Sequence, residues 1–132
     1  MPRWLDRVRR RAAPELRGAP AVRRMKNYAA LSGYAYEYFY EGYRDLDKRR
    51  EYRFTVSGDR KTWFPLAVWL CAGSAETWEQ EHDRRLDARE RYAVAKLALF
   101  SAFDERPNPE AARAPVEVTA AAAARLLERL EL

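Results

Sequence analysis

The 132-residue sequence is poor in cysteine, histidine and glycine, with one, one and five of them. A single cysteine, Cys71, cannot form a disulfide within the chain, which favours a reducing compartment. The sequence also contains no zinc-ligand pair, no glycine-rich phosphate loop and no Gly-x-Ser-x-Gly elbow. We therefore expect a protein without catalytic residues, without a bound metal and without a cofactor.

Long apolar runs are missing as well. No stretch approaches the roughly 20 apolar residues that cross a bilayer, so we expect no transmembrane helix. The arginine-rich N-terminus has no apolar segment behind it and no serines, which disfavours both a secretory signal and a mitochondrial transit peptide. Arginine outnumbers lysine 21 to 4, which we interpret as the codon usage of a GC-rich genome. We expect a bacterial, cytoplasmic protein.

Positive charge is concentrated in the first 27 residues. They contain nine Arg or Lys against two acidic residues, whereas residues 28–132 contain sixteen against eighteen. The whole chain is about the size of one domain, and 48% of it is hydrophobic, enough for a real core. The sequence therefore predicts a basic N-terminal arm, residues 1–27, attached to a nearly neutral body.

The arm combines an apolar anchor with a set of cations. Trp4, Leu5 and Val8 recur at helical spacing. This spacing predicts a short amphipathic helix over residues 3–13. We expect the arm to bind an acidic protein surface, with nucleic acid or a solvated, disordered arm as alternatives. The charge contacts would come from Arg9, Arg10, Arg11, Arg23, Arg24 and Lys26.

A tyrosine stands at every second position of residues 34–40. The strand predicted from Asn27 to Arg44 carries them on one face, while Glu37 and Glu41 lie on the other. The tyrosines are Tyr34, Tyr36, Tyr38 and Tyr40. Gly33 and Gly42 bracket this stripe and are expected to be bulges or bends.

The tyrosine stripe has three interpretations. A stacking platform for single-stranded nucleic acid is disfavoured by Glu37 and Glu41, because such platforms need basic neighbours. A ridge under an apolar helix, with the hydroxyls at the sheet margin, is the structural interpretation. A partner interface is the third, because tyrosine is enriched in binding hot spots. We expect a contact surface, either for the domain's own helix or for a partner.

Two further strands follow a polar connection at residues 45–50. Residues 52–57 alternate Tyr52, Phe54 and Val56 with Arg53 and Thr55 and predict one strand, residues 62–71 are predicted to form the next, and the turn chemistry of residues 57–60 joins them into a hairpin. Pro65 places the second strand at an edge or at a bulge. Trp63 and Trp69 share one face of that strand.

Three helices are expected after the hairpin. Ser74 is predicted to cap one that runs to about Leu86. Asp87, with Glu90 three residues on, predicts the start of another that ends near Glu105. Its segment 92–103 has a single charge, so we expect it to lie in the core.

The C-terminal part contains Pro107 and Pro109, and residues 106–114 are predicted to be a linker. Residues 116–118 are predicted to form a short strand, and Thr119 to cap the last helix. Its apolar stripe is Ala120, Ala123, Ala124, Leu127 and Leu130.

These elements predict an α+β fold. A three-stranded antiparallel sheet packs against the central apolar helix, between the basic arm and a C-terminal strand and helix. The predicted parts are the arm (1–27), the α+β core (28–106), and the linker with the C-terminal strand and helix (107–132).

Four residues are candidates for chemistry. Glu79 and His82 stand at the i, i+3 spacing of di-metal bundles, but a second copy is missing, and we expect a hydrogen-bonded core or boundary histidine. Cys71 is expected to be buried and inert rather than a nucleophile with His82. Lys96 is expected to extend its ammonium to solvent.

We therefore expect a non-catalytic accessory or adaptor subunit that binds protein partners of a larger intracellular assembly through its arginine-rich arm and its Tyr/Trp surface. One alternative is a nucleic-acid-binding protein that uses the arm. A second is a small enzyme or ligand-binding domain with a tyrosine-lined pocket.

Overall fold

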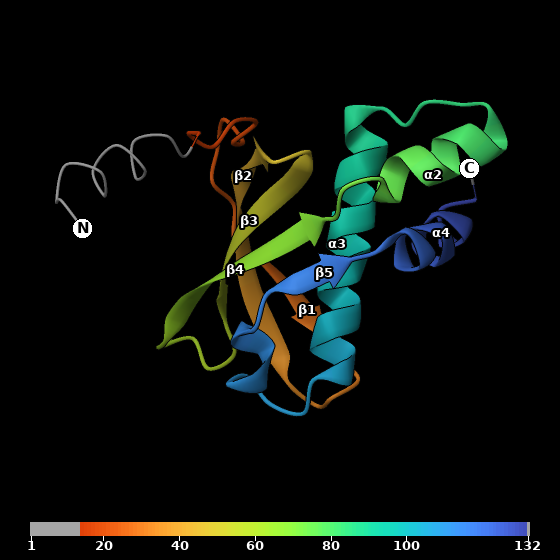
Figure 1. Cartoon of the computed structure of the whole chain (residues 1–132). Helices are drawn as coiled ribbons and strands as arrows, with labels where there is room; N and C mark the ends of the chain where they lie inside the picture. Colours follow the sequence, from red (N-terminus) through yellow and green to blue (C-terminus); the bar gives the residue numbers. More distant parts are fainter. Residues whose placement is uncertain (1–13, 132) are drawn as a thin grey trace, which may run out of the picture.

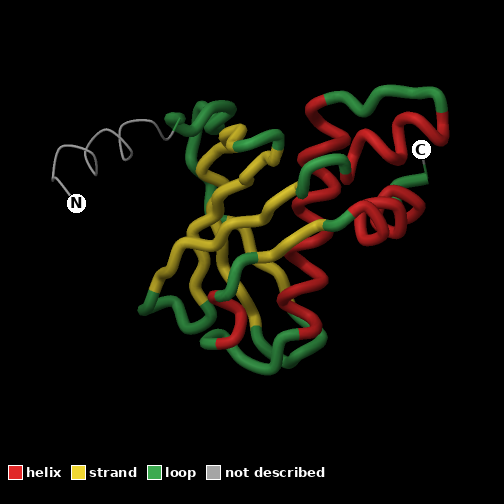
Figure 2. Tube along the Cα trace, viewed as in Figure 1, coloured by secondary structure: helices red, strands yellow, loops and turns green. Residues whose placement is uncertain are grey.

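The computed structural model describes residues 14–131 (Figure 1). A five-stranded sheet stands beside three α-helices, which gather on one side of it (Figure 2). In chain order the elements are β1 (Lys26–Ala29), β2 (Ala35–Leu46), β3 (Arg49–Ser57), β4 (Trp63–Leu70), α2 (Ser74–His82), α3 (Ala88–Glu105), the 3-10 turn η1 (Ala111–Arg113), β5 (Val116–Val118) and α4 (Ala120–Arg129).

The sheet has the order β1-β2-β3-β4-β5, with antiparallel neighbours except for the parallel pair β4 and β5. The expected α+β class is confirmed, but the expected three-stranded sheet is wrong. The alternating run from Asn27 to Arg44 is broken by a turn containing Gly33, so it forms two paired strands, β1 and β2. The short strand at residues 116–118 then joins β4 and completes five.

The β2–β3 hairpin is tighter than the expected polar connection. Leu46 pairs with Arg49, so only Asp47 and Lys48 form the turn. Their φ angles are 51° and 63°, the left-handed values of a two-residue hairpin turn. Within β2 a bulge lies between Tyr40 and Gly42, in line with the expectation for that glycine.

The β3–β4 hairpin forms as expected. The Asp59 carboxylate accepts backbone N–H groups of Lys61 and Thr62 at 2.8 and 2.7 Å and so holds the turn. Pro65 pairs with β3 on one side, while β5 covers only Val68–Leu70 on the other side of β4. Pro65 therefore lies on an open stretch of edge, where a missing N–H leaves no hydrogen bond unmade.

Helix α2 differs from its prediction at both ends. Gly73, with a φ of 80°, is the N-cap, because the chain turns sharply after β4 and the Ser74 N–H bonds to the Cys71 carbonyl at 3.0 Å. The helix ends at His82 rather than near Leu86. Asp83 takes a left-handed conformation, and the Glu79 carboxylate accepts the Leu86 N–H at 2.7 Å.

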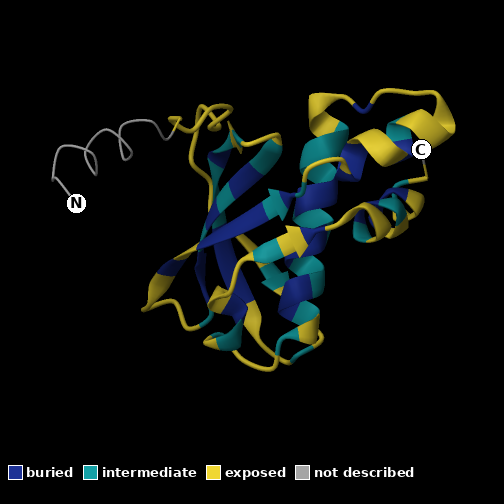
Figure 3. Cartoon of the chain, in the orientation of Figure 1, coloured by how far each residue is buried: buried dark blue, intermediate teal, exposed yellow. Residues whose placement is uncertain are grey.

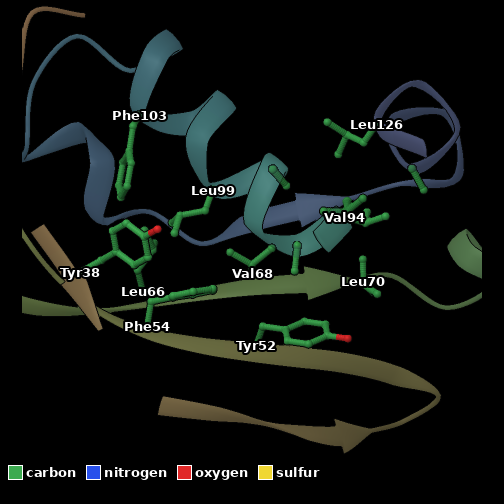
Figure 4. Packing of buried hydrophobic residues seen from close by; sticks show 14 of the residues in the cluster. Tyr38, Tyr52, Phe54, Leu66, Val68, Leu70, Val94, Leu99, Phe103 and Leu126 are labelled. Carbon is green, nitrogen blue, oxygen red and sulfur yellow. The ribbon is translucent and has the colours of Figure 1, made fainter. Parts of the chain in front are cut away.

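Helix α3 begins and ends where the sequence predicts. The Asp87 side chain accepts the Glu90 N–H at 2.8 Å, and the Glu90 carboxylate accepts the Asp87 N–H at 3.0 Å, a complete capping box. The buried side of this helix covers the sheet, as Figures 3 and 4 show. Its buried residues are Val94, Ala95, Ala98, Leu99, Ala102 and Phe103.

The segment predicted as a linker is packed against the domain. Ala112 is fully buried, and the Arg106 guanidinium donates to the carbonyls of Ala112, Ala114 and Pro115. The strand at Val116–Val118 is confirmed, and the Thr119 hydroxyl caps α4 by accepting the Ala122 N–H at 3.2 Å. Helix α4 packs against helices α2 and α3. Of its predicted stripe Ala123 and Leu127 are buried, and Leu126, which the stripe omits, joins them.

Candidate partner-binding surfaces

The two faces of the sheet have different chemistry. One, the helix face, carries the tyrosines of β2 together with Tyr52, Phe54 and Val56 of β3, and α3 packs on it. The other, which we call the open face, carries Phe39, Trp63 and Trp69 among charged residues. Within residues 14–131 no helix packs on the open face (Figure 1). The two faces therefore have to be considered separately as sites.

The four predicted tyrosines fall into different environments. Tyr36 and Tyr38 are buried, Tyr36 stacked on Phe103 at 4.1 Å between ring centroids and Tyr38 edge-on to Phe100. Tyr40 is half-buried, and Tyr34, outside β2, is 38% exposed. The middle of the stripe thus packs under the domain's own helix. Only its ends offer surface to a partner.

Three aromatic side chains of the open face reach solvent in part. Phe39 of β2 and Trp63 of β4 come from the two strands that flank β3, and their ring centroids are 5.4 Å apart. Trp63 is 37% exposed. Arg23 lies 3.8 Å above the Phe39 ring, and Arg49 lies 4.2 Å above the Trp69 ring. Cations over aromatic faces in this range are attractive and keep the rings and guanidinium groups in fixed positions.

Carboxylates neutralise most of the guanidinium groups on the open face. Arg23 binds Glu41 with both nitrogens, at 2.7 and 2.9 Å, and this contact lowers the Glu41 pKa below its usual value. Arg44 binds the buried Glu51 at 2.6 Å. The remaining pairs are Arg60 with Glu37, and Arg53 with Glu51. Arg49 has no carboxylate partner among residues 14–131.

The described part of the arm crosses from one face to the other. Arg17 forms an antiparallel bridge with Tyr43 at the edge of β2. Arg23 then lies on the open face, while Arg24 and Lys26 lie on the helix side. The other predicted arm contacts, Trp4, Leu5, Val8, Arg9, Arg10 and Arg11, lie outside the described residues.

A groove of about 440 Å³ opens between the edge of the sheet at β1 and β2 and the first half of α3. It brings together four of the predicted site residues, Arg24, Lys26, Tyr38 and Tyr40. The remaining lining residues are Pro20, Ala21, Val22 and Tyr92. Among the described residues, no carboxylate and no histidine lines this groove. Its polar groups are therefore cations and phenols only.

A second cavity, of about 640 Å³, lies between α3, β5 and α4. Charged side chains of both signs line it, namely Glu105, Arg106, Glu117, Arg125 and Arg129. Because groups of both signs line it, the cavity has no clear preference for a ligand of either charge.

The residues considered for catalysis stay apart. His82 is exposed, bonds the Trp78 carbonyl through Nδ1 at 3.0 Å and stacks on the Trp78 ring at 4.2 Å. It is hydrogen-bonded as expected, at the surface rather than in the core. Cys71 is half-buried, and burial raises its thiol pKa, which disfavours the thiolate. Among the described residues no group of three His, Cys, Asp or Glu side chains is placed to hold a metal ion.

Three functional candidates were missed by the sequence reasoning. Phe39 and Arg49 of the open face and Tyr92 of the groove did not enter the predicted set. Phe39 had a signal, since strand alternation places it opposite the tyrosines and beside the tryptophans of β4. Tyr92 had none, because its approach to Tyr40, with ring centroids 4.6 Å apart, depends on how α3 crosses the sheet.

In the described part of the chain, none of the helices has the length and apolar character required to cross a bilayer. Comparison with protein-family models, with curated proteins and with solved structures gives no significant match. Function is therefore inferred from the surfaces themselves.

Proposed function

We propose that this protein is a non-catalytic accessory or adaptor subunit that binds an acidic surface of a protein partner in a larger assembly. The binding surface is the open face of the sheet, extended by the basic arm. The observation that carries the proposal is the group Phe39, Trp63 and Trp69, set among arginines on a face that no described helix covers.

The composition of the open face supports a protein partner. Tryptophan and arginine are the residues most enriched in binding hot spots, where a few side chains carry most of the affinity. Trp63 is exposed enough to enter a partner's pocket, and its neighbour Phe39 is fixed by the Arg23 guanidinium. Rings held in place lose little conformational entropy on binding, which favours affinity.

The charge pattern favours protein over nucleic acid. A phosphate-binding face needs cations that are free to replace counterions. On the open face Arg23, Arg44 and Arg60 already bind carboxylates. Arg49 and the arm remain to meet an acidic patch of a protein. The nucleic-acid alternative rests on the arm alone.

The test is co-purification from the native host. The full chain, tagged at its C-terminus, is recovered after nuclease treatment at low and at high salt, and its partners are identified. The variant Trp63→Ser should lower the amount of stoichiometric partner recovered by about tenfold or more, as expected when a hot-spot residue is removed. The control is Leu31→Ser, which removes an apolar side chain that is 88% exposed in the β1–β2 turn, away from the open face.

Two results would overturn the proposal without supporting the nucleic-acid alternative. One is a monodisperse monomer without a stoichiometric partner. The other is a partner that both variants retain equally, provided that their melting temperatures match that of the wild type. If the associated material disappears on nuclease treatment, the nucleic-acid alternative replaces the proposal.

A further inference from the structure

The groove beside Tyr38, Tyr40 and Tyr92 concentrates positive charge, and no acidic residue of the described chain lines it. Arg24 and Lys26 line it. Lys96 lies one helical turn after Tyr92 on α3, next to the groove and not among its lining residues. None of these three cations belongs to an ion pair within residues 14–131. Nine arginines of the described chain have a carboxylate partner, whereas none of its four lysines does, so the groove is distinguished by its lining of cations and phenols rather than by unpaired lysines.

Two of these cations are held close together. Lys26 is directly opposite Tyr38 in the β1–β2 pairing, and its charge acts on Lys96 of α3. Burial and the neighbouring Lys26 charge lower the Lys96 pKa. Neighbouring like charges repel each other, and an anion placed between them would relieve the repulsion. The pair is therefore a candidate subsite for a negative group.

The phenols add neutral hydrogen-bond donors to the same groove. Burial raises the pKa of Tyr38 to about 12, and it also raises the pKa values of Tyr40 and Tyr92, so all three keep their protons at neutral pH. Within the described chain no hydrogen bond engages their hydroxyls. Such hydroxyls can donate to a carboxylate oxygen.

The rest of the lining suits a flat apolar body. The centroids of the Tyr40 and Tyr92 rings lie 4.6 Å apart, with the rings at an angle of 47°, and Pro20, Ala21 and Val22 add apolar side chains to the lining. A volume of about 440 Å³ lies within the 300–1,000 Å³ range of small-molecule pockets. Inorganic anions are too small to contact both the aromatic walls and the lysines.

We propose that this groove binds a small aromatic carboxylate, with the ring against Tyr40 and Tyr92 and the carboxylate between Lys26 and Lys96. Tyr38 forms the floor. The inference goes beyond the proposed adaptor function, because the groove opens on the helix side of the sheet and shares only the arm, through Arg24 and Lys26, with the proposed partner surface.

The experiment is calorimetric titration of the full chain with 4-hydroxybenzoate and indole-3-acetate, with NMR spectra to locate the site. Indole and inorganic phosphate serve as probes that lack the charge and the ring, respectively. We expect both carboxylates to bind at least about tenfold more tightly than either control probe. Chemical-shift changes should centre on Lys26, Tyr92 and Lys96.

Matched variants test the assigned contacts. Lys26→Met should weaken carboxylate binding about tenfold, and Tyr92→Phe about fivefold, in line with a lost charged and a lost neutral hydrogen bond. Lys61→Met, in the β3–β4 turn, removes an equal charge away from the groove and should leave affinity unchanged. Thermal melts establish that each variant is folded.

Three outcomes would overturn the inference. One is no heat and no shift change at millimolar carboxylate. Another is equal affinity for indole or phosphate, which would remove the need for charge or ring. The third is an equal loss of binding in Lys26→Met and Lys61→Met, which would indicate unspecific charge attraction.

Discussion

Gly42 lies at the bulge that returns Tyr43 to the helix face with the other tyrosines. Its φ is 128°, and a Cβ atom there would come within 2.7 Å of the Arg17 carbonyl oxygen. Gly42→Ala should therefore lower the free energy of unfolding by roughly 1–4 kcal/mol, through backbone strain plus the displaced arm segment. Urea denaturation at pH 7 measures this loss.

Gly33→Ala is the matched control for that substitution. Gly33 also has a positive φ, 95°, but a Cβ atom there would meet no other atom within 4 Å. Gly33→Ala should introduce the backbone strain without the steric clash, and should therefore lower the free energy of unfolding by less than Gly42→Ala does. Equal losses in the two variants would contradict a role for the contact between Gly42 and the arm.

The alternation of residues 34–40 predicts a tyrosine stripe, but it leaves open what covers the stripe. The cover differs from one tyrosine to the next. Phe103 of α3 packs on Tyr36 and Phe100 on Tyr38, whereas Tyr34 lies before the first residue of β2. A strand pattern contains no information about which helix residue lies above each ring. Those contacts depend on the crossing of α3 over the sheet.

Among the elements, α3 depends on a local signal at its first turn. Replacing Asp87 by Ala removes the acceptor of the Glu90 N–H and should lower the free energy of unfolding by about 0.5–2 kcal/mol. Asp87→Asn keeps an oxygen acceptor at the same position and should retain most of that stability. Urea denaturation of both variants is the measurement, and an equally large loss in Asp87→Asn would contradict capping as the cause.

Elements set by local chemistry were predictable, while those set by pairing were not. The side chains of Asp87 and Thr119 each accept a backbone N–H group three residues further along the chain, so both helices start where the sequence predicts. The cap at Gly73 arises from the sharp turn after β4, and the fifth strand exists because Val116–Val118 meets β4 from far along the chain. Such long-range pairings leave no periodic signal.

At the scale of the whole molecule, the sheet separates two candidate surfaces. The sequence predicts a basic arm and aromatic strands, and these expectations include Arg23, Arg24 and Lys26. It does not predict that neighbouring arm residues reach opposite faces, Arg23 to Glu41 and Arg24 to the tyrosine groove. The division lies between the Arg17–Tyr43 bridge and the start of β1 at Lys26, in a segment whose course no periodic pattern of the sequence predicts.

The Arg23–Glu41 pair should therefore fasten the arm to the sheet. Arg23→Met should speed amide exchange of Arg17 and Tyr43, whose mutual backbone bonds of 2.7 and 2.8 Å hold the same segment at the edge of β2. Arg24→Met removes the neighbouring charge, which has no carboxylate partner in the described chain, and should leave that exchange unchanged. Faster exchange in both variants would indicate a general charge effect.

Acid should act in the same way as the Arg23 substitution. Because the pair with Arg23 lowers the Glu41 pKa, the contact is present at and above the usual carboxyl range. It is lost only as the pH falls through the lowered pKa. The wild type should thus approach the Arg23→Met protein only in acid, below the usual glutamate pKa, and NMR titration of the Glu41 carboxyl measures that midpoint. A Glu41 pKa equal in the wild type and in Arg23→Met would contradict the fastening role, since an unpaired Glu41 must titrate higher than a paired one.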